Sequence, residues 1–288
     1  MDSHDDRDTA DDGSGGTVRE RFAEAARAER PDLALLCLLI NAEADPAAGE
    51  GTVDAAQAEL DRLTGLLPYE PSRDPRGWAR ALAALLGGEH GFHGTADDYR
   101  RLESSLLGEV LKRRRGLPIL LSVVWMEVAR RAGAPVYGIA LPGHFLVGFG
   151  DPAGEHAVAD PFAGGRLLDD QDVELLVAAS TGAALPEALL RPAGPLEIVL
   201  RVLNNIRAWA AARPEHTDVQ LWAVELSLLL PHHPARLRYE RARLLVERGD
   251  FVGGAREMEH YADTVAAMEP SAADAIRRQA RAARARLN

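Results

Sequence analysis

The sequence is poor in cysteine, and this scarcity limits both its redox chemistry and its metal chemistry. Its 288 residues include one cysteine, Cys37. A single cysteine excludes an intrachain disulfide and any metal cluster built from cysteines. Cys37 lies inside the apolar run LALLCLLI, which predicts a buried, inert thiol, because a reactive thiolate needs a polar and accessible setting. We expect neither a metal site nor a cofactor.

Long apolar runs and an excess of basic charge are also missing. No stretch approaches the roughly 18 uninterrupted apolar residues of a membrane-spanning helix. The segment MDSHDDRDTADDGSGG has neither the basic nor the apolar part of a signal peptide, which favours a cytoplasmic location. The formal net charge is −11, and this segment, with six Asp and one Arg, carries about five of those charges. Such a balance predicts no binding to nucleic acids or to membranes.

Composition and periodicity predict three regions along the chain. Residues 1–16 are acidic and aperiodic, so we expect a disordered tail. Residues 17–190 contain several helical patterns followed by short strand patterns, which predicts an α+β domain. Residues 191–288 are expected to be helical throughout. There the tetrapeptides LLLP and AMEP end two successive helix pairs 39 residues apart, somewhat longer than the roughly 34-residue period of tetratricopeptide repeats.

The predicted α+β domain has one segment that is apolar on almost every side. The first twelve residues of PILLSVVWMEVARRAG, which begins at Pro118, include only Ser122 and Glu127 as polar residues. This pattern is typical of a helix that is buried all round. Segments rich in Val and aromatic residues follow, separated by turns: PVYGIAL, HFLVGFG, HAVAD and GRLLD. We therefore expect a central helix packed on an antiparallel sheet.

Two polar residues stand at the ends of predicted strands. His144 begins the second strand and Asp160 ends the third. If the turn between these strands is centred on Pro152, the two residues lie directly opposite each other, with Cβ atoms about 5 Å apart. A carboxylate at that distance holds an imidazole N–H and fixes its tautomer, as in a catalytic triad. A register slip of one residue would place the two side chains on opposite faces.

A triad also needs a nucleophile, and the sequence does not supply one at the expected place. The N-terminus of a helix is favourable for a thiol because the helix dipole lowers its pKa. The predicted central helix begins with Pro118, which has no nucleophilic side chain. Ser122 carries the nearest hydroxyl group, but it lies one helical turn, about 5.4 Å, further along the axis.

The segment RRRGLPILLSVVWMEVARRAGAPVYGIALPGHFLVGFGD, with the later DPFAGG, closely resembles the transglutaminase-like core of bacterial SirB-type proteins. The resemblance implies a papain-like α+β core followed by C-terminal tetratricopeptide-like helices. In active transglutaminase-like enzymes a cysteine opens the central helix, and a histidine and an aspartate lie on the strands that follow. By that match His144 and Asp160 occupy the histidine and aspartate positions, and Pro118 occupies the position of the missing cysteine.

Two functions are compatible with this pattern. The first is a pseudoenzyme that serves as a protein- or peptide-binding module, with His144 and Asp160 vestigial or binding a ligand and the helical repeats holding a protein partner. The alternative is a residual amide hydrolase or acyl-transferase that uses this pair with Ser122, a water or a substrate-supplied nucleophile. Neither the identity of a partner nor the oligomeric state is predicted.

Four further polar residues are candidate binding residues. Arg114 and Arg115 directly precede the predicted central helix. They either bind an anion at its entrance, or Arg115 pairs with a carboxylate of the fold. Asn204 and Asn205 stand in the middle of a predicted C-terminal helix, where asparagine is unfavourable. We expect either that one of them hydrogen-bonds the preceding domain or that they face solvent.

Overall fold

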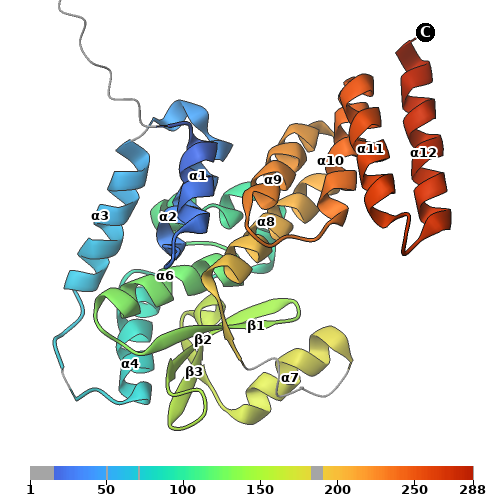
Figure 1. The fold of residues 1–288 in the computed structure, drawn as a ribbon. Coiled ribbons are helices and arrows are strands. Elements are labelled where there is room, and N and C mark those ends of the chain that lie inside the picture. Colours follow the sequence, from blue (N-terminus) through green and yellow to red (C-terminus); the bar gives the residue numbers. More distant parts are fainter. Residues whose placement is uncertain (1–15, 50, 71, 183–190, 288) are drawn as a thin grey trace, which may run out of the picture.

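The computed structural model describes residues 16–49, 51–70, 72–182 and 191–287. The predicted acidic tail lies outside these residues, except for Gly16. An antiparallel sheet lies at one end of the molecule with helices packed against it, and the C-terminal helices extend away from it (Figure 1). The predicted order, an α+β core followed by a helical region, is confirmed.

The N-terminal part of the fold is helical. Its helices are α1 (Val18–Arg27), α2 (Leu33–Ala44), α3 (Gly51–Gly65), α4 (Pro75–Leu82) and α5 (Leu107–Arg113). Helix α4 continues into a π-helical segment over Ala83–Glu89, which includes the glycine pair Gly87-Gly88. Helix α2 is buried on nearly all sides, because its apolar residues occupy every face. Helices α2, α3, α4 and α5 contact the central helix, which follows them in the chain.

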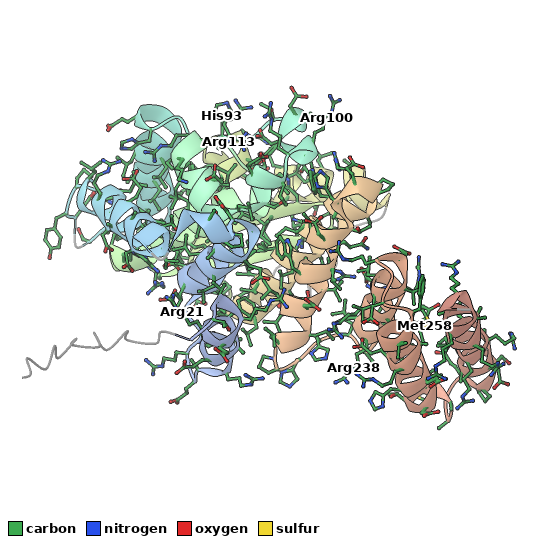
Figure 2. All side chains as sticks on the ribbon, turned by 90° about the horizontal axis from the view of Figure 1, so that it is seen from above. Arg21, His93, Arg100, Arg113, Arg238 and Met258 are labelled. Carbon is green, nitrogen blue, oxygen red and sulfur yellow. The ribbon has the colours of Figure 1, made fainter. Side chains whose placement is uncertain are left out.

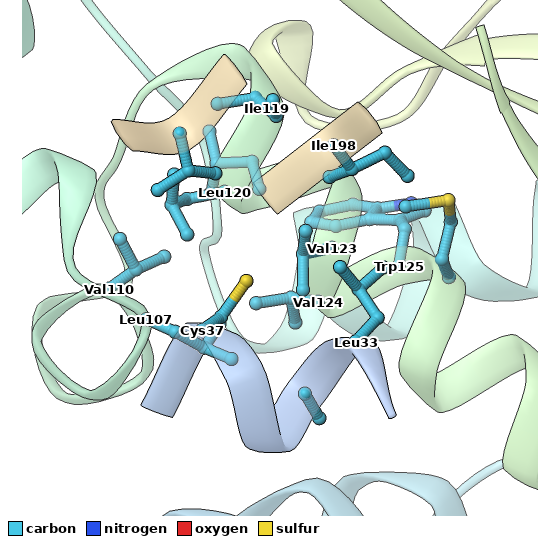
Figure 3. Close-up of a cluster of buried hydrophobic side chains, with 14 of the residues drawn as sticks. Leu33, Cys37, Leu107, Val110, Ile119, Leu120, Val123, Val124, Trp125 and Ile198 are labelled. Atoms are coloured by element: carbon cyan, nitrogen blue, oxygen red, sulfur yellow. The ribbon is translucent and has the colours of Figure 1, made fainter. Parts of the chain in front are cut away.

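The central helix is α6 (Pro118–Arg131), and it is confirmed as the most deeply buried of the elements described here. All residues from Pro118 to Ala129 are buried. Pro118 occupies the first turn, where a missing N–H costs no hydrogen bond, and Gly133 follows the end of the helix with a φ of +86°. Figure 3 shows side chains of α6 packed against α2 and α5 in this core.

The sheet contains all four predicted strands. In chain order the strands are β1 (Val136–Leu141), β2 (His144–Gly150), β3 (His156–Asp160), β4 (Arg166–Leu168) and β5 (Pro192–Ala193). They lie in the order β4-β3-β2-β1-β5, with every neighbouring pair antiparallel. Strand β5 was not predicted, because two residues that include a proline carry no strand pattern. Helix α7 (Asp170–Thr181) follows β4, and Asp169 caps its N-terminus.

The register between β2 and β3 differs from the predicted one. Val147 pairs with Ala159 and Gly150 pairs with His156, so His144 does not stand directly opposite Asp160. The prediction of direct opposition is wrong because the connecting turn is centred on Ala153, one residue later than Pro152. This displaces the pairing by two residues. Side chains alternate between the faces of a sheet with a period of two, so both residues still point to the same face.

The C-terminal part of the chain is helical, as predicted. It contains α8 (Pro195–Ala211), α9 (Thr217–Leu229), α10 (Arg236–Glu247), α11 (Phe251–Val265) and α12 (Pro270–Arg284). Buried residues of α8 and α9 belong to the same apolar cluster as α6, whereas α10, α11 and α12 share a second cluster. The domain boundary predicted after residue 190 stays a prediction. Among the described helices, none combines the length and the apolar character needed to cross a membrane.

Candidate functional site

His144 and Asp160 meet at the end of the sheet. His144 begins β2 directly after the turn at Gly143, and Asp160 ends β3. Their side chains are largely buried, and Nε2 of His144 lies 3.0 Å from Oδ1 of Asp160. This contact has the length of a hydrogen bond but not its alignment. The carboxylate is held in place by the main-chain N–H of Phe162, which donates to Oδ1 at 2.9 Å.

Phe162 forms an aromatic wall beside this pair. Its ring lies edge-on to the imidazole of His144, with centroids 5.9 Å apart, and at 6.0 Å from the ring of Tyr99. Gly94 permits this position, because a Cβ added there would lie 1.9 Å from the ring of Phe162. The N–H of Gly94 also donates to the carbonyl O of Phe162 at 2.9 Å. The loop around Gly94 therefore positions the aromatic ring against the imidazole.

Two residues that sequence reasoning missed, Tyr99 and Arg201, complete the site. Arg201 of α8 donates from Nη2 to the carbonyl oxygens of Leu141 and His144, the latter at 2.7 Å. Burial lowers the pKa of Arg201, and the charges of the nearby Glu197 and Tyr99 offset part of this shift. Burial raises the pKa of the half-exposed Tyr99, and the negative charge of Asp160 raises it further. Both residues lie far from His144 in sequence, so no local pattern identifies them.

The N-terminus of α6 provides no nucleophile. Its first residue is Pro118, and the hydroxyl group of Ser122 donates to the carbonyl O of Phe145 at 3.2 Å. Ser122 is fully buried, and this hydrogen bond links α6 to β2 at Phe145, the residue after His144. The structure thus gives this serine a bond to the main chain and no hydrogen bond to the imidazole.

The thiol of Cys37 does not reach the site either. Cys37 lies on α2 among apolar residues of α5 and α6, including Leu107, Val110 and Val124 (Figure 3). Its residue surface is 1% exposed. Burial raises the pKa of this thiol, and the charges of Glu127 and Asp32 raise it further, so the thiolate is not populated at neutral pH.

Arg114 and Arg115, which precede α6, both pair with carboxylates of the fold. Nη2 of Arg114 donates to Oε1 of Glu59 at 2.7 Å. Nη2 of Arg115 lies 3.2 Å from Oδ2 of the buried Asp98 and donates to Thr95. Burial opposes the ionisation of Asp98, but bonds from Thr95 and Arg115 outweigh it and hold its pKa below the usual range. These pairings do not support a shared anion site at the entrance of α6.

The amides of α8 do not bridge to the α+β core. Oδ1 of Asn204 accepts a hydrogen bond of 2.5 Å from Arg207 on the same helix. No hydrogen bond of the Asn205 side chain occurs within the described part of the chain. Besides Arg201, polar links to the core come from Trp209 of α8 and from Arg213, just after this helix, which both donate to the carbonyl O of Arg100. Apolar residues of α8 pack into the core as well.

The imidazole of His144 thus lies between a carboxylate and two aromatic rings. Asp160 occupies the Nε2 side of His144, and no hydrogen bond of Nδ1 occurs among the residues described. The walls are Phe162 and Tyr99. No group of three or more His, Cys, Asp or Glu side chains with metal-binding geometry occurs in the described parts of the chain.

Comparison with known proteins agrees with this architecture. Residues 52–204 match the Transglutaminase-like superfamily, and residues 206–288 match a tetratricopeptide repeat. The first match covers more than half of the chain, so the chain belongs to the transglutaminase-like superfamily, and tetratricopeptide repeats follow this domain.

Two of the similar curated proteins are UPF0162 proteins. A UPF0162 protein of Xylella fastidiosa (strain 9a5c) is 33% identical over 64% of this chain and 68% of its own length. The UPF0162 protein YchA of Escherichia coli (strain K12) is 30% identical over 55% of this chain and 56% of its own length. Among solved structures, a crystal structure of menin aligns with 85% of this chain over 68% of the menin chain, with 14% identity and a TM-score of 0.42. The SirB-type assignment is narrower than these matches and stays a prediction.

Proposed function

We propose that this protein is a non-catalytic, SirB-type member of the transglutaminase-like superfamily that binds a protein or peptide partner. The observation that carries the proposal is the residue at the start of α6. Pro118 stands where the superfamily resemblance requires a nucleophilic cysteine, and the single thiol of the chain, Cys37, is buried elsewhere. Loss of the nucleophile from a triad costs about 10⁶ in turnover, which an imidazole and a carboxylate alone do not restore.

A groove between α1, α9, α10 and α11 supports the binding role. It encloses about 430 Å³, with Leu228 and Leu229 exposing apolar surface and charged side chains around them. The charged lining residues that bear on the argument are Arg19, Glu225, Arg238, Arg241 and Glu257.

Most of the charges in this groove are paired with each other. Arg19 and Arg241 both bind Glu225, at 2.7 and 2.9 Å, and Arg241 also binds Glu257. The exposed Arg238 has no side-chain partner in the described part of the chain, and it lies on the C-terminal helices away from His93 and Arg113 (Figure 2). Arg19 also binds Glu43 at 2.6 Å, so each of the two paired arginines already has carboxylate partners. The unpaired guanidinium of Arg238 is therefore the group that favours an acidic residue of a bound peptide.

A residual amide hydrolase or acyl-transferase is the second candidate. It is favoured by the 3.0 Å contact between His144 and Asp160, which resembles the base and orienter of a triad. Its nucleophile would be a water or a group of the substrate, because the hydroxyl group of Ser122 is bonded to the main chain.

A screen with amide and ester probes separates the two candidates. We expect no turnover above background in the wild-type chain or in His144→Ala. The matched control is His156→Ala, which removes an exposed histidine of β3. Turnover that is lost in His144→Ala and kept in His156→Ala would establish the hydrolase or transferase and overturn the non-catalytic proposal.

The binding role is tested with the immobilised 288-residue chain. Proteins retained from a lysate of the source cells are compared between wild type, Arg238→Glu and Arg236→Glu. Arg236 is exposed on the same helix but does not line the groove. A partner of this groove is lost with Arg238→Glu and kept with Arg236→Glu. Equal retention by both variants would refute the groove as the binding surface.

A further inference from the structure

A second cavity lies between α2, α3 and α5, and it shares no residue with the His144 site. Its volume is about 340 Å³, within the roughly 300–1,000 Å³ range of small-molecule pockets. Its apolar lining comes from Leu38, Val53, Ala56 and Leu111. Such a surface binds an aliphatic or aromatic body by the hydrophobic effect.

One polar side chain in this lining has no protein partner. Asn41 of α2 is 7% exposed, and its carboxamide makes no hydrogen bond within the described residues. The atom buried without a partner is Oδ1, an acceptor, and leaving it unpaired costs on the order of 1–3 kcal/mol. Leucine of nearly the same shape would fill this position without that cost. Nδ2 of the same amide has no hydrogen-bond partner among the described residues either, so it is a donor for a ligand in the cavity.

The charges at the rim of the cavity favour an anion. Glu59 accepts hydrogen bonds from two arginines, Arg62 and Arg114, at 2.6 to 2.9 Å. The hydrogen bonds from Arg62, together with that from Arg114, lower the pKa of Glu59 from 4.5 to about 2 despite partial burial. One carboxylate thus serves two guanidinium groups, which leaves one positive charge uncompensated. Lys112 also lines the cavity, paired with Glu109 at 2.8 Å.

Arg114 itself contributes a further unsatisfied group. Its Nη1 is buried without a hydrogen-bond partner, while Nη2 binds Glu59. The residue has a φ of +60°, a left-handed conformation that is uncommon outside glycine. The guanidinium group lies 4.6 Å from the centre of the Phe92 ring, which holds it beside the cavity.

We propose that this cavity binds an apolar monocarboxylate. The aliphatic or aromatic body lies against Leu38, Val53 and Leu111. The carboxylate lies at the rim, where the unpaired Nη1 of Arg114 and Nδ2 of Asn41 provide hydrogen-bond donors. This site is independent of the function proposed for the His144 site and for the groove of the C-terminal helices.

The test uses the full-length chain and sodium octanoate as the probe. Lys112 is the one lysine of the sequence, so reductive methylation with ¹³C-formaldehyde labels a single side chain at the rim, beside the terminal amine. We expect a saturable shift of the Lys112 methyl resonance and the same affinity by calorimetry on the unmodified chain. Octan-1-ol, which lacks the charge, binds at least about tenfold more weakly. No saturable octanoate binding, or equal binding of the alcohol, overturns the proposal.

Two exposed alanines of α3 provide a matched pair of variants. Ala55 lines the cavity and Ala58 does not, and both are exposed, so tryptophan at either position leaves the core intact. Ala55→Trp abolishes octanoate binding, and Ala58→Trp leaves it unchanged. Equal affinities in these two variants would place octanoate elsewhere and overturn the site.

Asn41→Leu tests the amide separately. If Asn41 contacts the carboxylate, this variant folds with unchanged or higher thermal stability and binds octanoate at least about tenfold more weakly. If octanoate binds the variant as tightly as it binds wild type, the role of Asn41 is refuted. Circular dichroism of each variant confirms the fold before binding is measured.

Discussion

Nη2 of Arg201 donates a hydrogen bond of 2.7 Å to the carbonyl O of His144. The same nitrogen binds the carbonyl O of Leu141, so one side chain of α8 holds both ends of the turn between β1 and β2. The guanidinium group also lies 5.7 Å from the centre of the Phe145 ring. The position of His144 therefore depends on a helix that begins about fifty residues later in the chain.

Replacement of Arg201 by methionine removes these donors while it retains much of the side-chain volume. Two buried carbonyl oxygens lose a charged partner, so we expect the free energy of unfolding to fall by about 2 kcal/mol. The imidazole resonances of His144 shift as well. Chemical denaturation and NMR measure both effects. Arg236→Met, at an exposed position, is the control, and equal stability of the two variants contradicts the role of Arg201.

Gly94→Ala is expected to displace Phe162 from His144. The added Cβ would lie 1.9 Å from the phenyl ring, and the main chain at Gly94 is tied to Phe162 by a hydrogen bond. Overpacking of this kind costs about 1–3 kcal/mol in unfolding free energy. Thermal denaturation measures it. In Gly65→Ala the new methyl group meets no atom within 4 Å, so that variant should not lose stability. A loss of the same size in both would disprove the steric explanation.

Cys37 is expected to resist thiol reagents in the folded chain. Burial raises the pKa of its thiol, and its surface is almost fully covered. With Ellman's reagent the folded chain should therefore release little chromophore, and the chain unfolded in guanidinium chloride should release one equivalent. Rapid stoichiometric reaction of the folded chain would show that the thiol is accessible and would reopen the search for a nucleophile.

The lowered pKa of Glu59 predicts that the stability of the fold depends on pH in the acidic range. Its pKa is lowered from 4.5 to about 2 by Arg62 first and by Arg114 in addition, so the folded state favours the ionised carboxylate. A lowered pKa in the folded state contributes stability above the unfolded pKa, and this contribution is lost as the pH falls from about 4.5 to about 2.

We therefore expect the stability difference between wild type and Glu59→Gln to shrink over this pH range. Urea denaturation at a series of pH values measures it. Glu24→Gln, which changes an exposed glutamate without a side-chain partner among the described residues, should show no such trend. A constant difference between wild type and Glu59→Gln would mean that Glu59 is not stabilised in its ionised form.

The candidate site was only partly predictable from the sequence. His144 and Asp160 were found because each stands at the end of a recognisable strand, and the predicted face was right although the register was not. An error of two residues preserves the face, whereas an error of one would not. Phe162 lies in the segment DPFAGG. Its contact with His144 depends on Gly94, however, and no sequence spacing connects these two residues.

Most helices and strands, and the lack of a nucleophile at Pro118, follow from the amino-acid sequence alone. A helix that is apolar on all sides must be buried, alternating segments must form strands, and proline has no nucleophile in any conformation. Contacts between side chains far apart in the chain follow from the tertiary packing. Arg201, Tyr99 and Asn41 owe their surroundings to the packing of helices far apart in the chain, and this packing follows from the whole apolar core, not from local periodicity.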